Sequence, residues 1–457
     1  MEAVLNYLEE NKKRFTKELC DYVRFPSVSA QPRHKKDLAN CANWLFKNCR
    51  EIGLEAKIFP TAGNPIVVAK TPREKNSRKP HFLIYGHYDV QPAEPFELWR
   101  TPPFAPRIEG RSLYGRGASD NKGQNLAHLK TAEAYLRTKT ELPCDLTFVI
   151  EGEEEVGSKN LAEFLKRNRG DLKCHGVVVS DTGMPDGKHP ALTYALRGIV
   201  AVEIKLQGPS RDLHSGIFGG TVDNPALALC QLLGKLRDKN GRIAIPDFYE
   251  DVVPLTKYER KQFARLPMTE GEYRKFLGVP KLFGEHGFTP FEQRAARPTI
   301  EINGLISGYQ GEGSKTIVPA WASAKLTFRL VPNQTPAPVR AAILKQLKKL
   351  WPPTVKMSCQ SGHGGEPYLV SPKSAIAQAG LRALKKAFGC EPILMREGGS
   401  IPIVHDFKKI LGAETLLLGL GLPDDNPHSP NEKFDLDNFE KGMRMSAYLW
   451  QELARAV

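Results

Sequence analysis

The sequence predicts an α/β protein built on a mostly parallel sheet and interrupted by an inserted α+β domain. Helical patterns and short apolar runs alternate through about the first 190 residues, which is typical of a parallel sheet with crossover helices. Between about residues 198 and 365, a long two-strand region, a helix, a Pro-rich loop-heavy stretch, another strand and another helix replace this alternation. The last segment returns to the first pattern.

The individual elements follow from periodicity. Apolar residues at helical spacing predict helices over residues 3–24, 38–52, 122–138, 158–168, 226–238, 338–350, 372–388 and 436–456. Short β-rich apolar runs predict strands over residues 81–85, 146–150, 177–180, 199–206, 324–331 and 415–418. We therefore expect one domain in two segments, 1–197 and 368–457, with an inserted domain over 198–367.

The charge of the chain first suggests an acidic partner. Its 457 residues include 65 Lys and Arg against 51 Asp and Glu, a net charge of +14. A positive charge of this size is compatible with nucleic-acid binding. The basic runs at 73–79, 257–265 and 345–349 are short and interrupted, as on solvated helix faces. No RNP-type strand, zinc finger or basic zipper accompanies them, and we expect no nucleic-acid partner.

Membrane and secretory classes are also disfavoured. The longest apolar stretch, around 415–422, is much shorter than the ~20 residues of a membrane span. The first residues are acidic and amphipathic, unlike a secretory signal. The eight cysteines include no C-x-x-C pair, so we expect reduced thiols in a cytoplasmic protein and no membrane partner.

Polar side chains that could bind a metal stand at the end of one predicted strand and just before one predicted helix. His87 and Asp89 come after the strand 81–85 at positions i and i+2, which point the same way in an extended segment. The carboxylate can then accept the free N–H of a metal-bound histidine, although this pattern alone also fits a surface loop. Asp120 stands in a Gly-rich turn before a helix, either as its N-cap or as a carboxylate held over the sheet.

Further acidic residues follow the next strands. Four glutamates lie within 151–155, where they are costly unless a cation neutralises them or solvent reaches them. Asp181 also follows a strand, and His428 stands in a Pro-rich turn. Because ligands collect beyond the carboxyl ends of parallel strands, these residues form a mixed His and carboxylate set. Such a set suits zinc, manganese or cobalt better than calcium.

Taken together, these stretches resemble the di-metal aminoacylase/dipeptidase superfamily, and most of all its carnosinase-like branch of cytosolic nonspecific dipeptidases. The likeness runs nearly end to end. It is carried by His87-Tyr-Asp-Val-Gln-Pro, Trp99 with Pro102-Pro103-Phe104, Gly115-Arg-Gly-Ala-Ser-Asp, Asp212-Leu-His-Ser-Gly, Gly313-Ser-Lys-Thr, Phe328-Arg-Leu-Val-Pro and Arg396-Glu-Gly-Gly-Ser-Ile-Pro. The resemblance implies a di-metal peptidase catalytic domain, with the insert as a lid and dimerisation domain.

The resemblance also implies two divalent metal ions, zinc or manganese. His87, Asp120 and Asp181 would hold one ion, and Asp120, Glu155 and His428 would hold the other, so that Asp120 bridges them.

Two more acidic residues gain implied roles. Asp89 would orient His87. Glu154 would be the general base, taking a proton from a water that bridges the metals and passing it to the leaving amine. Members of the superfamily also have a cis peptide bond after the bridging aspartate, here Asp120-Asn121.

The remaining implied residues bind the substrate. Arg329 would grip the C-terminal carboxylate of a small peptide, because a guanidinium can bind it as a fork. Ser400 would donate a hydrogen bond nearby. His214, in an oxyanion role, and Thr316 would come from the partner subunit, so the resemblance implies a homodimer.

We therefore predict a cytoplasmic metallo-dipeptidase. The alternative is a deacylase of N-acyl amino acids with the same metal centre, although the stretch 99–104 and the long insert favour the dipeptidase branch. A third hypothesis is a catalytically silent protein that binds RNA through its basic surface. It predicts loss of metal ligands or of the base, and each of these residues is present.

Overall fold

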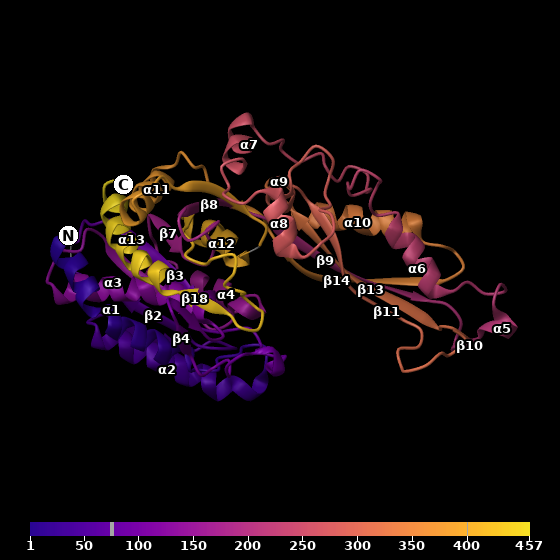
Figure 1. The fold of residues 1–457 in the computed structure, drawn as a ribbon, viewed down its shortest axis with the longest axis horizontal. Helices are drawn as coiled ribbons and strands as arrows, with labels where there is room; N and C mark the ends of the chain where they lie inside the picture. Colours follow the sequence, from indigo (N-terminus) through magenta and orange to yellow (C-terminus); the bar gives the residue numbers. More distant parts are fainter. Residues whose placement is uncertain (74–76, 400) are drawn as a thin grey trace.

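The two ends of the chain fold together into one body, and the middle of the chain forms an arm that projects from it (Figure 1). This computed structural model describes residues 1–73, 77–399 and 401–457. Both termini lie on the body, at the end away from the arm.

A single mixed sheet forms the centre of the body. Among the described residues it has nine strands. Their order is β1 (Glu55–Phe59), β2 (Ile66–Lys70), β6 (Asp145–Glu151), β3 (His81–His87), β7 (Gly176–Val179), β17 (Thr415–Leu417), β8 (Ala191–Leu196) and β15 (Tyr368–Leu369), and β16 (Ile393–Glu397) also pairs with β8. The central strands β6, β3, β7 and β17 are parallel. They are buried along their length, as expected when helices cover both faces.

Helices from both ends of the chain cover this sheet. They are α1 (Glu2–Val23), α2 (Lys35–Glu51), α3 (Gln124–Arg137), α4 (Leu161–Arg167), α11 (Ala375–Phe388), α12 (Pro402–Asp406) and α13 (Leu436–Ala454). Shorter helical turns occupy Pro32–His34, Phe96–Leu98, Ala118–Gly123, Glu154–Val156 and Phe407–Leu411. Among the described residues, no helix has both the length and the apolar character needed to cross a membrane.

The body has one hydrophobic core to which both chain ends contribute. Phe15 of α1 and Trp450 of α13 are both fully buried in it, and Trp450 lies against Tyr135 of α3 with ring centroids 5.5 Å apart. The described members of this core include no residue between Leu196 and Tyr368. The domain limits 1–197, 198–367 and 368–457 remain a prediction.

The arm is built on a separate antiparallel sheet. Its strands are ordered β11 (Thr299–Ser307), β13 (Trp321–Leu330), β9 (Gly198–Gln207) and β14 (Lys356–Gly365). Buried and more exposed residues alternate along β13, because α6 (Pro225–Gly234) and α10 (Pro336–Leu350) cover one face only. At the far tip, β10 (Leu213–His214) pairs with β12 (Ile317–Val318) next to α5 (Ser215–Phe218) (Figure 1).

The loop-heavy stretch predicted in the middle of the insert also contains three short helices that were not predicted. This stretch contains α7 (Lys257–Phe263), α8 (Glu270–Leu277) and α9 (Pro290–Ala296). Each helix begins with a capping box, in which a threonine at the N-cap and a glutamate three residues later satisfy each other's backbone N–H groups. The T-x-x-E spacing was the available signal, since helices of two turns show little periodicity.

Two of these helices, α7 and α9, belong to the insert in sequence but contact β16 of the body. Glu259 of α7 accepts a hydrogen bond from the Tyr194 hydroxyl at 3.1 Å and pairs with Arg396 of β16. Leu266, just after α7, packs against Ile393 and Met395. The insert therefore has two parts, one fixed to the body and one forming the free arm.

A small three-stranded sheet completes the body. In it, β18 (Lys433–Asp435) pairs with β5 (Ser112–Tyr114), which pairs with β4 (Arg107–Glu109). This sheet brings the segment that follows His428 beside the segment that precedes Asp120.

The buried His128 makes the stability of the body depend on pH. Its Nε2 lies 2.9 Å from the Ser180 hydroxyl and its Nδ1 lies 2.8 Å from the Ser446 hydroxyl. Burial lowers the pKa of His128 from 6.5 to about 4. As the pH falls below 6.5, the unfolded chain binds a proton here before the folded chain does, so folding stability decreases until about pH 4.

We predict a loss on the order of 3 kcal/mol from this group across that window. Urea unfolding at a series of pH values measures it. The His128→Gln variant should show a flatter dependence on pH, whereas His286→Gln, which changes an exposed histidine, should behave as the unchanged protein. Equal slopes for all three proteins would contradict the prediction.

Candidate metal centre

Five predicted ligand residues meet at one edge of the body sheet. His87 ends β3, Glu155 lies in the turn after β6, and Asp181 follows β7. Asp120 lies in the turn before α3, and His428 lies in the loop between β17 and β18. The carboxyl ends of parallel strands share one edge of a sheet, which is why residues so far apart in sequence come together.

The side chains form two groups that share one residue. The His87 Nε2 atom lies 3.1 Å from Asp120 Oδ1 and 3.7 Å from Asp181 Oδ2. The His428 Nε2 atom lies 3.0 Å from Asp120 Oδ2 and 3.4 Å from Glu155 Oε2. In each group the potential ligand atoms all lie within 4.8 Å of one another. Asp120 thus points one carboxylate oxygen toward each group, so that it could bind two neighbouring cations.

The electrostatics of this edge favour positive charge. Burial, and then the charge of Asp120, raise the pKa of Glu155 to about 10. Burial also raises the pKa of Glu154 well above its usual range. Crowded buried carboxylates are stabilised by cations, and oxygen with imidazole nitrogen is a donor set for divalent transition metals. The residues present therefore fit a pair of divalent metal ions.

The Asp89 carboxylate connects the histidine and the glutamates. Its Oδ1 accepts the backbone N–H of Glu154 at 3.2 Å, and its Oδ2 accepts that of Glu155 at 3.1 Å. The His87 Nδ1 atom lies 3.0 Å from the Asp89 carbonyl oxygen and 3.4 Å from its carboxylate. Asp89 thus contacts His87, and it also holds the glutamate turn, which the sequence did not indicate.

Glu154 and Glu155 point in different directions from this turn. The Glu155 carboxylate accepts a hydrogen bond from Gln91 Nε2 at 2.8 Å and faces His428. Glu154 instead lines the cavity in front of the ligands. Neighbouring residues can therefore serve separate purposes.

Glu432 anchors two of the ligand loops, and sequence reasoning gave it no role. Its fully buried carboxylate accepts hydrogen bonds from Arg116 Nη1 at 2.7 Å and from the backbone of Gly117, Ser119 and Asp120 at 2.9, 3.0 and 3.1 Å. Because Glu432 follows His428 by only four residues, one side chain positions both loops. The sequence signal that could have indicated this role is the acidic residue four positions after His428.

Asn121 connects ligands from two strands and was also missed. Its Nδ2 donates to Asp181 Oδ1 at 2.9 Å and to the Ser180 carbonyl at 2.6 Å. Its Oδ1 accepts the backbone N–H of His87 at 3.4 Å. The Asp120-Asn121 peptide bond is cis, as the resemblance implied.

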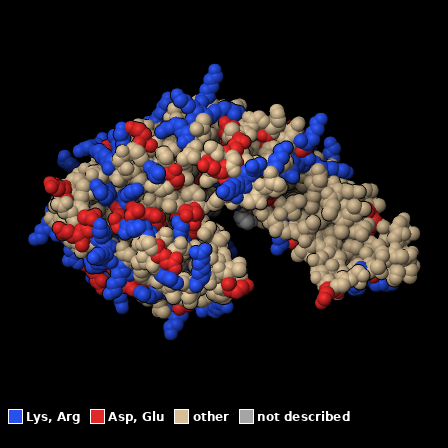
Figure 2. All heavy atoms as spheres, viewed as in Figure 1, with Lys and Arg blue, Asp and Glu red and all other residues tan. Residues whose placement is uncertain are grey.

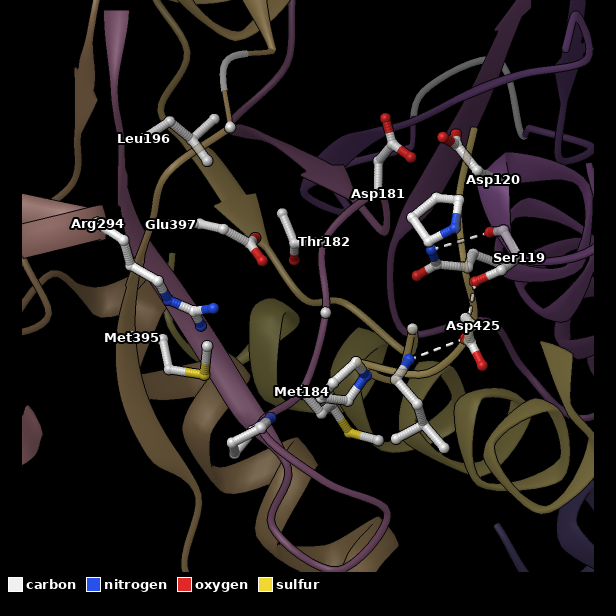
Figure 3. A pocket seen from close by; sticks show the side chains of 18 of the residues that line it. Ser119, Asp120, Asp181, Thr182, Met184, Leu196, Arg294, Met395, Glu397 and Asp425 are labelled. Atoms are coloured by element: carbon white, nitrogen blue, oxygen red, sulfur yellow. Dashed lines mark hydrogen bonds between the residues drawn. The ribbon is translucent and has the colours of Figure 1, made fainter. Parts of the chain in front are cut away.

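The ligands open onto a cavity of about 490 Å³. Asp120, Asp181 and His428 lie on one side of it. Its other wall comes from α8, α9 and β16, and Figure 3 shows Arg294 and Glu397 of this wall across from the two aspartates. The His428 side chain is 56% exposed whereas that of His87 is fully buried, so the His428 side is the open one.

The remaining predicted residues do not join this cluster within the described chain. His214 and Thr316 lie together at the tip of the arm, where the Ser215 N–H donates to the Thr316 carbonyl at 3.1 Å. Arg329 is half-buried in β13, opposite Ile199 of β9, and is not among the described residues that line the cavity. Ser400 lies outside the described residues.

The sequence pattern of Peptidase family M20/M25/M40 matches residues 83–452. The chain belongs to this family. It is therefore a peptide-bond hydrolase, and the resemblance and fold class predicted from the sequence are confirmed.

Its relatives in this family include dipeptidases. The chain is 30% identical over 472 residues to a Cys-Gly metallodipeptidase of Schizosaccharomyces pombe, covering 99% of this chain and 98% of the relative. It is 29% identical over 476 residues to a Beta-Ala-His dipeptidase of Rattus norvegicus, covering 100% and 96%. The crystal structure of human carnosine dipeptidase 1 matches with a TM-score of 0.87 and 29% identity, over 99% of this chain and 98% of that one.

Removing the Glu432 charge should weaken metal binding without touching a ligand. We predict that Glu432→Gln loses about 10- to 100-fold in affinity for zinc or manganese, as is usual when a group that orients ligands is changed. Competition with a chelator measures this. Glu440→Gln is the matched control, because Glu440 pairs with Arg111 at the surface. If both variants bind metal as tightly as the unchanged protein, Glu432 does not position the ligands.

Proposed function

We propose that the protein is a metal-dependent dipeptidase. The observation that carries this proposal is a pair of ligand groups that have Asp120 in common, with Glu154 in the lining of the cavity beside them. The relatives named above, which are dipeptidases and cover nearly the whole chain, support a dipeptide as the substrate.

Two divalent metal ions, zinc or manganese, are part of this proposal. His87, Asp120 and Asp181 would hold one, and Asp120, Glu155 and His428 the other. When bound, such ions polarise the scissile carbonyl and lower the pKa of water toward neutrality.

Glu154 acts as the general base in this proposal. Its backbone is fixed by Asp89 at 3.2 Å, and its carboxylate lines the cavity. It takes a proton from the attacking water and delivers it to the nitrogen of the leaving amine. Burial favours the protonated form, which helps a carboxylate that must act first as a base and then as an acid.

Arg329 and Ser400 are proposed to bind the C-terminal carboxylate of the dipeptide. Arg329 lies at the body end of the arm sheet: the Oγ1 atom of its cross-strand partner Thr299 lies 3.3 Å from Arg197 Nη1. Burial lowers the pKa of Arg329, and a carboxylate bound there would favour its charged form.

A homodimer is proposed to complete the active site. His214, as the oxyanion donor, and Thr316 lie at the arm tip, far from the cavity of their own chain (Figure 1). Beside His214, the Ile217 side chain is 68% exposed, and three exposed apolar residues, Ile302, Leu305 and Ile306, lie on β11. Figure 2 shows that the outer arm carries few charged residues on this face, unlike the body. Exposed apolar surface of this kind supports a protein interface.

The cytoplasmic location stays part of the proposal. All eight cysteines fall within the described residues, and each is a free thiol. Free thiols are usual in a reducing compartment.

Hydrolysis of plain dipeptides tests the proposal directly. With added zinc or manganese, we expect turnover of Ala-Ala but not of N-acetyl-alanine. Glu154→Gln should keep two metals per chain and lose about 10²- to 10⁴-fold in kcat, the usual contribution of a general base. Metal analysis and steady-state kinetics measure both effects.

Preferred turnover of the acetylated amino acid would instead identify a deacylase. Normal kcat in Glu154→Gln would remove Glu154 from its role as the base.

Mixing two inactive variants tests the shared site. Glu154→Gln and His214→Asn should each be nearly inactive as homodimers. If His214 acts in the partner's cavity, a mixed dimer contains one cavity with neither change, so mixing after subunit exchange should restore up to about a quarter of the unchanged activity per chain. Sedimentation confirms the dimer. Activity no higher than the sum of the separate variants would show that His214 does not act across the interface.

A further inference from the structure

We propose that Arg294 and Glu397 form the subsite for the N-terminal residue of the substrate, and that Arg294 selects dipeptides with an acidic N-terminal side chain. This inference rests on the proposed dipeptidase function and names its substrate class.

Both residues line the same cavity as the metal ligands. Arg294 comes from α9 and Glu397 ends β16. Figure 3 shows the two side chains on the wall across from Asp120 and Asp181, with Thr182 between the two sides. The nearby lining is apolar and comprises Met184, Leu196, Leu266, Met268 and Met395. This wall therefore offers one positive and one negative group on an apolar background.

The Arg294 guanidinium lies near two aromatic rings. It lies 5.6 Å from the Phe291 ring centroid and 5.7 Å from that of Tyr273. Within the described part of the chain, no ion pair joins Arg294 to a carboxylate, Glu397 included. A guanidinium beside aromatic rings can still present its edge to a carboxylate as a fork.

Glu397 offers the complementary charge. Its carboxylate accepts the backbone N–H of Gly183, and in Figure 3 it points into the cavity. Burial raises its pKa to about 7, although the charge of Arg294 opposes this rise. A substrate ammonium beside Glu397 would favour the ionised carboxylate.

The subsite lies where α9 packs against the body. A Cβ atom added to Gly398 would lie 2.6 Å from the Arg294 carbonyl oxygen, so the backbone of α9 packs directly on the end of β16. Arg197 Nε donates to the Gly398 carbonyl at 3.1 Å and strengthens this contact. These contacts fix Arg294 and Glu397 relative to each other.

The position of the wall indicates which end of the substrate it contacts. The metal ligands fix the scissile bond, and Arg329, proposed for the C-terminal carboxylate, lies outside the described cavity lining. The wall is left for the N-terminal residue. The α-ammonium of that residue would face Glu397, and an acidic side chain would reach Arg294. An N-terminal Glu or Asp carries both groups on one residue.

Kinetics with three dipeptides test this inference. We expect kcat/KM for Glu-Ala to exceed that for Ala-Ala by about 10- to 100-fold, the contribution of one charge-assisted pair. Arg294→Gln should reduce the ratio of kcat/KM for Glu-Ala to that for Ala-Ala to about one. Arg294→Glu should reverse the preference, so that Lys-Ala becomes the better substrate.

Arg274→Gln is the matched control. Arg274 is an exposed residue of α8 beside Tyr273, and it does not line the described cavity. If the preference reflects only the positive field of the protein, Arg274→Gln and Arg294→Gln should weaken it equally, and the subsite is refuted. The subsite is also refuted if Arg294→Gln lowers Ala-Ala and Glu-Ala by the same factor, because Arg294 would then act only through Glu397.

A binding measurement separates this inference from the proposed function. Calorimetric titration of Glu154→Gln with Glu-Ala and Ala-Ala needs no turnover. Tighter binding of Glu-Ala than of Ala-Ala, lost in the Glu154→Gln, Arg294→Gln double variant, supports the subsite. This holds even if the unchanged enzyme hydrolyses neither dipeptide, a result that would overturn only the dipeptidase proposal. Equal binding of both dipeptides overturns the subsite, whatever the enzyme hydrolyses.

Discussion

The hydrogen bonds that converge on the Glu432 carboxylate are the constraint on which the candidate metal centre depends. A buried carboxylate is stable only when its oxygens are well supplied with donors, and here one guanidinium and three backbone N–H groups supply them. The same interactions hold the turn with Asp120 against the loop with His428. On the opposite side, Asp89 and Asn121 perform the same task for the glutamate turn and for Asp181. The ligands are thus fixed by a ring of polar contacts around them.

The sequence predicted the parts of the fold in which local pattern and burial agree. The strands β3, β6 and β7 are buried throughout and read as apolar runs, and the residues that follow them are those brought together at the sheet edge. Sequence could not reveal Arg294, because α9 shows no periodicity and its guanidinium gains significance only from a cavity shared with Asp120. Glu432 and Asn121 were missed for a related reason, since their partners are mostly backbone N–H and C=O groups.

The two parts of the insert lie in different places on the molecule, one at the cavity and one at the end of the arm. One part, with α7 and α9, is joined to the body through Glu259 and Leu266 and contributes a wall of the cavity. The other part carries His214 and Thr316 outward on a four-stranded sheet. Residues within one insertion therefore serve two different purposes: the near part shapes the cavity of its own chain, and the far part presents an apolar, weakly charged surface.

The shared core of the body also determines the order in which a newly made chain can become an enzyme. The strands β3, β6 and β7 are synthesised early, but β17, which pairs with β7, and α13, which packs on α3 and α11, come much later in the chain. His428 and its anchor Glu432 lie between β17 and α13. The arm has its own core and can fold while the last segment is still within the ribosome, because domains generally fold as units during synthesis. Until residues 428–432 emerge, the nascent chain lacks His428 and its anchor Glu432, so the proposed ligand set is completed only after the arm has been made.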